Sequence, residues 1–357
     1  MSGIVMMIIA IVVLGGAYLL YGRYLQNKWG IDPKAKTPAY EMEDGVDYVP
    51  ADTNVVFGHQ FASIAGAGPI NGPIQAAIFG WLPVMLWILI GGVFFGAVQD
   101  FASMYASVKN KGRTIGYIIE AYIGKLGKKL FLLFCWLFCI LVVAAFADGE
   151  AAAQGLTTQP QIFAGAIANF LSVIGLPHSL VFTLINLAVS AFALTSLDSV
   201  ARVGRLSFQE FFLDSDTDEE NMSPFLKVVT NKYFATIITL VLAYLLTKVG
   251  YAEIWPLFGS ANQLLSVLAL VACAVFLKKT KRQGCMLWIP MVFMMAVTFT
   301  ALGMTISKLT KALFTTGLDL GNTLQLIFAV LLLILGVLVA IQGVKKLFEK
   351  NDEKQTA

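Results

Sequence analysis

The sequence predicts an all-α, polytopic membrane protein with about nine transmembrane helices. Its 357 residues are 58% hydrophobic and only 13% charged, with a mean hydropathy of +0.76. A soluble domain has about 25% charged residues. Apolar runs of about 20 residues, the length that crosses the hydrocarbon core, recur along the chain. Lysine and arginine cluster between alternate runs, as is typical of cytoplasmic loops.

The predicted spans follow these apolar runs in chain order. They are residues 4–20, 57–80, 81–105, 130–147, 179–197, 233–249, 259–277, 286–306 and 323–342. If the N-terminus is outside and the C-terminus is cytoplasmic, every basic cluster faces the cytoplasm. The outer loops then contain only Lys248, Lys308 and Lys311.

This orientation divides the chain into three parts. Residues 1–147 form an N-terminal membrane bundle, and residues 179–357 form a C-terminal bundle with a cytoplasmic loop at 206–231. Residues 148–178 form an external junction that contains an interfacial helix at 161–177. This helix is apolar on one face, and a full crossing there would reverse the orientation of every later basic cluster.

Residues 57–80, FGHQFASIAGAGPINGPIQAAIFG, form the least regular span. Its two prolines and five glycines interrupt a helix. Irregular backbone at membrane depth is tolerated where it lines a cavity or is covered by protein, and secondary transporters bind substrates at such breaks. The alternative is a kinked helix whose glycines only permit close packing. We favour a binding site with the candidate residues His59, Gln60, Ser63, Gly66, Gly68, Pro69, Asn71 and Gly72.

Four further polar residues lie inside predicted spans or at their ends. Asp100 and Asp198 are candidates for proton coupling, because a carboxylate near membrane depth usually faces a cavity or a partner. For Asp198, an ordinary helical pair with Arg202 is an equally good interpretation. Asn262 and Gln263, in a second interrupted stretch, either bind a carboxylate or hydrogen-bond to another helix.

Several classes of function find no support in the sequence. GxSxG, Walker A and HExxH motifs are absent, and the two histidines are isolated, so we expect no enzyme, metal site or cofactor. The net charge of +3 gives no indication of a nucleic-acid partner. Small residues in the spans allow a homo-oligomer without predicting one.

The chain resembles the carbon starvation protein A family in four stretches: GHQFASIAGAGPINGP, GWLPVMLWILIGGVFFGAVQDF, AFALTSLDSVARVGRLSFQEF and WPLFGSANQLL. The resemblance implies an inner-membrane, proton-coupled carrier of pyruvate or peptides that acts during nutrient limitation. It also implies a fold distantly similar to the amino acid–polyamine–cation carriers, with helices broken in the membrane. The chain departs from the family pattern between Ala147 and Thr157, where several spans and a GFHS-type motif are missing.

Three hypotheses follow. In the first, the broken span holds the carboxylate of pyruvate or a short peptide, His59 titrates near neutral pH, and Asp100 and Asp198 handle protons. In the second, the protein is a shortened membrane protein that binds a ligand or partner without transporting it. The third, an intramembrane enzyme, is the weakest, because no catalytic motif is present.

Overall fold

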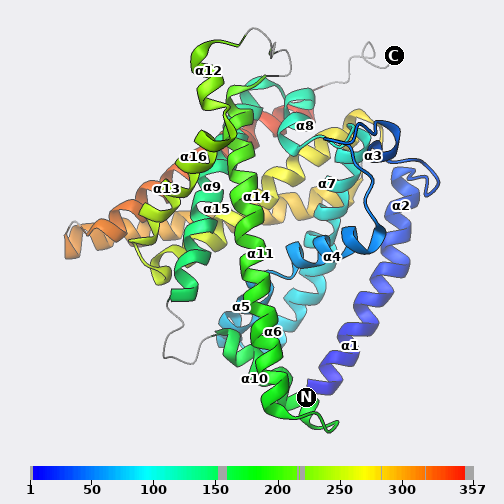
Figure 1. The fold of residues 1–357 in the computed structure, drawn as a ribbon, viewed down its shortest axis with the longest axis vertical. Coiled ribbons are helices and arrows are strands. Elements are labelled where there is room, and N and C mark those ends of the chain that lie inside the picture. The colour runs from blue at the N-terminus through cyan, green and yellow to red at the C-terminus, as the bar shows by residue number, and fades with distance from the viewer. Residues whose placement is uncertain are drawn as a thin grey trace.

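The structure, a computed structural model, describes residues 3–151, 159–214, 217, 222–282, 284–317 and 319–349. These residues form helices and no strand (Figure 1). The first half contains α1 (Gly3–Gly16), η1 (Ala17–Gly22), α2 (Arg23–Trp29), α3 (Pro38–Glu41), α4 (Thr53–Ile64), α5 (Ala67–Ala76), η2 (Ala77–Phe79), α6 (Trp81–Leu86), η3 (Trp87–Ala97), α7 (Val98–Lys109), α8 (Ile115–Tyr122) and α9 (Lys125–Ala151). The second half contains α10 (Gln159–Ser172), α11 (His178–Phe212), α12 (Pro224–Val229), α13 (Lys232–Thr247), α14 (Tyr251–Lys279), α15 (Cys285–Thr316) and α16 (Leu320–Phe348).

Seven helical segments in the described residues are long and apolar enough to cross a membrane, so the protein is a multi-pass membrane protein. They are Gly3–Trp29, Trp81–Lys109, Lys125–Phe146, His178–Phe212, Ile254–Lys279, Cys285–Thr315 and Gly321–Phe348. The other two predicted spans differ from this pattern. Residues 57–80 are divided between α4, α5 and η2, and α13 has only 16 residues, fewer than the about 20 that cross the hydrocarbon core.

Two element boundaries predicted from the sequence also differ from those in the structure. Helix α11 continues to Phe212, so the loop that was predicted from residue 206 begins at Leu213. The helix is extended because Phe208 is buried and its ring lies 4.9 Å from that of Trp136 on α9. The predicted interfacial helix at 161–177 is α10, which ends at Ser172 before a turn with Gly175 in the left-handed region. Residues 152–158 of the predicted junction lie outside the described residues.

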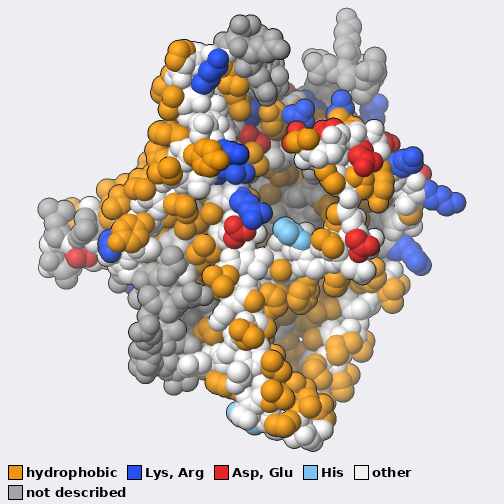
Figure 2. Space-filling model, viewed as in Figure 1, with side chains coloured by type: hydrophobic (Ala, Val, Ile, Leu, Met, Phe, Trp, Pro, Cys, Tyr) orange, Lys and Arg blue, Asp and Glu red, His pale blue; other side chains and the backbone are white. Residues whose placement is uncertain are grey.

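The helices run in two main directions (Figure 1). Helix α11 runs along the long axis in front of α5 and α6, with α1 and α2 at the side, whereas α13, α15 and α16 extend crosswise to the left. Charged side chains gather at the upper end of the molecule, around α3, α8 and α12, and the lower end is mostly hydrophobic on the visible face (Figure 2). Which side of the membrane this charged end faces stays a prediction.

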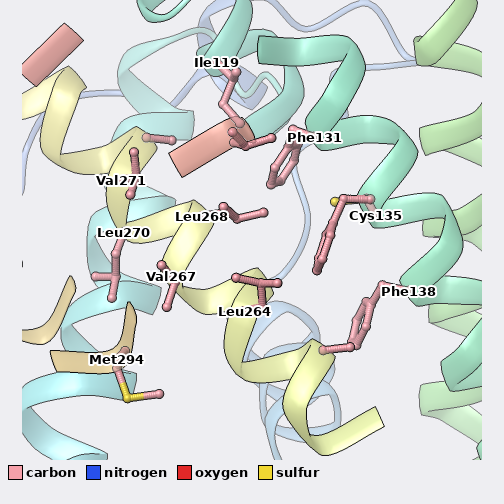
Figure 3. Close-up of a cluster of buried hydrophobic side chains, with 14 of the residues drawn as sticks. Ile119, Phe131, Cys135, Phe138, Leu264, Val267, Leu268, Leu270, Val271 and Met294 are labelled. Carbon is pink, nitrogen blue, oxygen red and sulfur yellow. The ribbon is translucent and has the colours of Figure 1, made fainter. Parts of the chain in front are cut away.

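Helix α14 is the centre of the core, where it packs against α9, α15 and α16. Its side chains at Leu264 and Leu268 face Phe131 and Phe138 of α9 (Figure 3). Because α14 is covered on several sides, nearly every residue from 264 to 277 is buried. A helix that is apolar all round is expected in such a position.

Two glycines of α16 allow this helix to approach α14 closely. A Cβ atom built at Gly343 lies 2.0 Å from Cγ1 of Val271, and one at Gly336 lies 2.5 Å from Cδ2 of Leu264. Valine is stiff at χ1, so Val271 has little freedom to move away. Small residues are the usual means of close helix packing in membranes.

The segment between α3 and α4 is folded against the turn that follows α7. The backbone N–H groups of Val46, Asp47 and Tyr48 each donate to Oδ1 of Asp44 at 2.9 Å. These donors, that of Tyr48 foremost, lower the pKa of the Asp44 carboxyl. The Tyr48 hydroxyl donates to the Lys111 carbonyl at 2.8 Å and ties the segment to the bundle.

The contact between α14 and α16 gives a first prediction. The Gly343→Ala variant should lose about 1–3 kcal/mol of unfolding free energy, because the new methyl group overlaps Val271. The matched control is Gly303→Ala on α15, where nothing lies within 4 Å of the added Cβ, and it should be neutral or gain up to about 1 kcal/mol. Thermal unfolding in detergent measures both. Equal midpoints for the two variants would contradict the close packing.

Candidate functional site

The predicted break in residues 57–80 lies between α4 and α5. Helix α4 ends at Ile64, and Gly66 precedes α5 with an extended backbone. Helix α5 contains Pro73, which lacks an N–H donor. The discontinuous helix that the sequence predicted is therefore confirmed, and two short helices replace one span.

Helix α11 covers one side of this break. A Cβ atom built at Gly66 lies 2.8 Å from Oγ of Ser196, so a side chain at position 66 has no room unless Ser196 moves. Nearby, the rings of Phe61 on α4 and Phe192 on α11 meet edge to face with centroids 6.1 Å apart. Glycine at position 66 thus allows the broken backbone to lie directly against α11.

The start of α5 provides unpaired hydrogen-bonding groups. Its first amides have no partner within the helix, and no side chain caps them. Asn71, one turn further, is only 6% exposed, and its Oδ1 atom has no hydrogen-bond partner among the described residues. Buried polar atoms are rarely left unpaired. An amide oxygen accepts hydrogen bonds, so a group that pairs with this atom must carry an N–H or O–H donor.

The other predicted residues of the broken span differ in their surroundings. His59 and Gln60 are exposed on α4. Ser63 is exposed too, but its hydroxyl donates to the His59 carbonyl at 2.8 Å and is thereby satisfied within its own helix. Gly68 is half-buried, whereas Pro69 and Gly72 are exposed.

Helix α14 reaches α5 through a contact that the sequence did not reveal. The indole N–H of Trp255 donates to Oε1 of Gln75 at 2.9 Å. Trp255 lies next to Pro256 in the sequence, and this neighbour is the one local signal of an irregular stretch there. Asn262 is exposed and Gln263 half-buried, and no described contact joins either of them to α5.

The two candidate proton-coupling carboxylates lie on different helices, Asp100 on α7 and Asp198 on α11. Asp100 is exposed on α7, next to Gln99, which accepts a hydrogen bond from Ser266 of α14 at 3.0 Å. Asp198 forms an ion pair with Arg202 at 2.7 Å, and these side chains are 61% and 68% exposed. The helical pair that was one of the two interpretations of Asp198 is therefore present. Asp198 also lies two residues after Ser196, close to the break.

The described residues contain no group of three or more histidine, cysteine, aspartate or glutamate side chains that could hold a metal ion. The site is thus composed of backbone amides, an asparagine and hydroxyl groups, and its residues can recognise an anionic or polar ligand by hydrogen bonds.

The long apolar helices define a polytopic membrane protein. The break between α4 and α5, which packs against α11, adds a discontinuous helix. The sequence profile described as "Carbon starvation protein CstA" matches residues 2–153 and 147–301. The chain therefore belongs to the carbon starvation protein CstA family. The two matched segments overlap at residues 147–153.

Three curated relatives show the extent of the similarity. "Peptide transporter CstA" of Escherichia coli (strain K12) is 43% identical over 132 residues, which are 37% of this chain and 19% of that protein. "Peptide transporter CstA" of Campylobacter jejuni is 38% identical over 181 residues, or 48% of this chain and 26% of that protein. "Pyruvate/proton symporter BtsT" of Escherichia coli (strain K12) is 42% identical over 132 residues, or 37% and 18%. Thus the matched stretch spans about a quarter or less of each relative. No solved structure matches the chain.

Water access to α4 gives a second prediction. A cysteine at position 59 should react with a membrane-impermeant maleimide, because thiols react as thiolates and need water. The matched control is a cysteine in place of Ile8, which is 53% exposed on α1. Because α1 belongs to an apolar candidate membrane span, we expect lipid rather than water around this position. Cys285, the exposed cysteine among the four, is first replaced by serine. Equal labelling at positions 59 and 8 would contradict a water-filled space beside α4.

Proposed function

We propose that the chain carries the substrate-binding region of a proton-coupled secondary transporter for pyruvate or short peptides. Family membership and the printed names of the relatives support transport of this kind. The observation that carries the proposal is the break between α4 and α5, where α11 packs against Gly66 and no side chain caps the first amides of α5. We place the protein in the cell inner membrane, with the N-terminus outside and the C-terminus in the cytoplasm.

The proposed ligand group is a carboxylate, which pyruvate and the C-terminus of a peptide share. The N-terminus of a helix attracts anions through its unpaired amides and its dipole. At the start of α5, nothing lies within 4 Å of a Cβ atom built at Gly68, which leaves room for the ligand to approach the backbone. Asn71, through its side-chain amide, and Ser196 on α11 then provide polar contacts around the carboxylate.

The proposed proton coupling involves His59, Asp100 and Asp198. His59 is exposed on α4 and lies two turns before the break. Protonation of Asp198 breaks its ion pair with Arg202. This pair lies on α11 next to Ser196, the residue that contacts Gly66. Asn262 and Gln263 are proposed to contact the substrate from α14. We expect no catalytic turnover, in line with the names of the relatives.

The second candidate function is ligand binding without transport. It is considered because the matched stretches span only 19% and 26% of the first two relatives. A broken helix forms one wall of a site, and the opposite wall in a full-length carrier comes from other spans. The names of the relatives favour transport over this alternative.

The experiment that tests the proposal is uptake of labelled pyruvate, or of a labelled dipeptide, into proteoliposomes with an imposed pH gradient. We expect uptake that depends on the gradient and disappears with a protonophore. Uptake no higher than in empty vesicles would end the transport proposal. Binding of pyruvate in detergent without uptake would favour the second function.

Asn71 gives a third prediction. The Asn71→Leu variant should lower uptake about 10- to 100-fold, because it removes a hydrogen bond to a charged ligand. The same change should leave the unfolding free energy unchanged or raise it by about 1 kcal/mol, since an unpaired buried polar group is removed. The control, Gly303→Ala, should retain uptake. A loss of stability in parallel with uptake would instead indicate a structural role for Asn71.

A further inference from the structure

Three charged side chains are buried together where α8, α9 and α11 meet. Lys128 of α9 is fully buried, and Glu120 of α8 and Glu210 of α11 are 9% and 6% exposed. The group contains two carboxyls and one amine. If all three were ionised, one negative charge would be buried without a partner, which is costly.

The hydrogen bonds and the ion pair of Lys128 are made with groups other than Glu210. Its Nζ atom forms an ion pair with Oε2 of Glu120 at 2.5 Å and donates to the Leu213 carbonyl at 2.9 Å. Nζ also lies 4.3 Å from the centroid of the Tyr117 ring. The ammonium group has three protons to donate, and these three contacts account for them.

Glu210 has only a neutral donor. The Thr114 hydroxyl lies 3.0 and 3.2 Å from its two carboxyl oxygens, and Glu210 makes no ion pair within the described part of the chain. A Cβ atom built at Gly116 lies 3.0 Å from Oε2 of Glu210 and 2.9 Å from Leu132. The pocket is therefore closed by α8 and α9, and a hydroxyl alone is weak compensation for a buried carboxylate.

The charges that act on Glu210 come from the helices packed against its end of α11. Lys128 of α9 and Arg113, just before α8, attract a negative charge there, whereas Glu120 of α8 repels it. The Cys135 thiol of α9 also faces this group. Helices α12 and α13 pack against α11 as well, but none of their described side chains contributes a charge to this set.

We propose that Glu210 is a proton-binding site of the folded protein. The inference rests on the proposed function for its use in transport, but the proton site itself does not. Glu120 and Lys128 form the ionised pair, and Glu210 holds the extra proton as a neutral carboxyl. Its release gives a carboxylate and one proton, and the carboxylate then needs water or a cation, so the contact between α8 and α11 must open.

Helix α11 connects this proton site to the break. Ser196, which touches Gly66, and Glu210 are fourteen residues apart on one continuous helix, or about 21 Å along its axis. A displacement of one end of a rigid helix is transmitted to the other end. Glu210 thereby links proton release to the position of α11 over the α4–α5 break, in addition to Asp100 and Asp198.

The test is infrared difference spectroscopy of the whole chain in lipid vesicles between about pH 5 and about pH 9. We expect a C=O stretching band from a protonated carboxyl that disappears as the pH rises and is absent from the Glu210→Gln variant. The control Glu349→Gln removes a carboxylate that is 58% exposed at the end of α16 and should retain the band. An identical band in the wild type and Glu210→Gln would overturn the proposal.

Thr114 variants keep the test decisive if Glu210→Gln fails to fold. Thr114→Val removes the donor to the ionised form, so the band should persist to a higher pH, by about one unit. Thr114→Ser should restore the wild-type titration, and an unchanged titration in Thr114→Val would overturn the proposal. Pyruvate uptake is measured in the same vesicles. A titrating band without uptake would reject the transport function and leave the proton site intact.

Discussion

Every backbone polar group inside a membrane must find a partner within the protein, and the rest of this structure depends on that constraint. Within the described residues, seven long apolar helical segments meet it with continuous helices, whereas the backbone is interrupted between α4 and α5. There, the irregular backbone at Gly66 lies against Ser196 of α11. The break is tolerated because α11 covers it, and α11 is held in turn by α9 through the packing of Phe208 on Trp136.

The two kinds of packing in the protein have different consequences. The contact of α14 with α9 and α16 is apolar and close, with Gly336 and Gly343 removing the space between helices. Such a contact resists rearrangement. The end of α11 instead packs on α8 through Thr114 and Glu210, a polar contact whose strength depends on a proton. The close-packed core thus supports α11, and the contact between the C-terminal end of α11 and α8 depends on the protonation of Glu210.

Much of the fold could be predicted from the sequence, because about 20 apolar residues identify a span whatever its neighbours. The break was predictable for a similar reason, since the glycines and prolines between Gly66 and Pro73 act locally. The burial of Lys128, Glu120 and Glu210 was not, because charged residues near span ends resemble solvent-exposed loop residues. Their pairing depends on α8, α9 and α11 meeting, which no local pattern encodes. The same holds for Ser196 as the neighbour of Gly66 and for the Trp255–Gln75 bond.

The central claim is that the α4–α5 break lies against α11, and cysteine cross-linking tests it most directly. In a chain without native cysteines, the pair Gly66→Cys and Ser196→Cys should form a disulfide in membranes under mild oxidation, because the structure brings these positions into direct contact. The matched pair, Gly66→Cys with Val203→Cys, places the second thiol seven residues further along α11, or about 10 Å along its axis, and should not react. Pyruvate should slow the first cross-link. Failure of the first pair, or equal cross-linking of both pairs, would contradict the account.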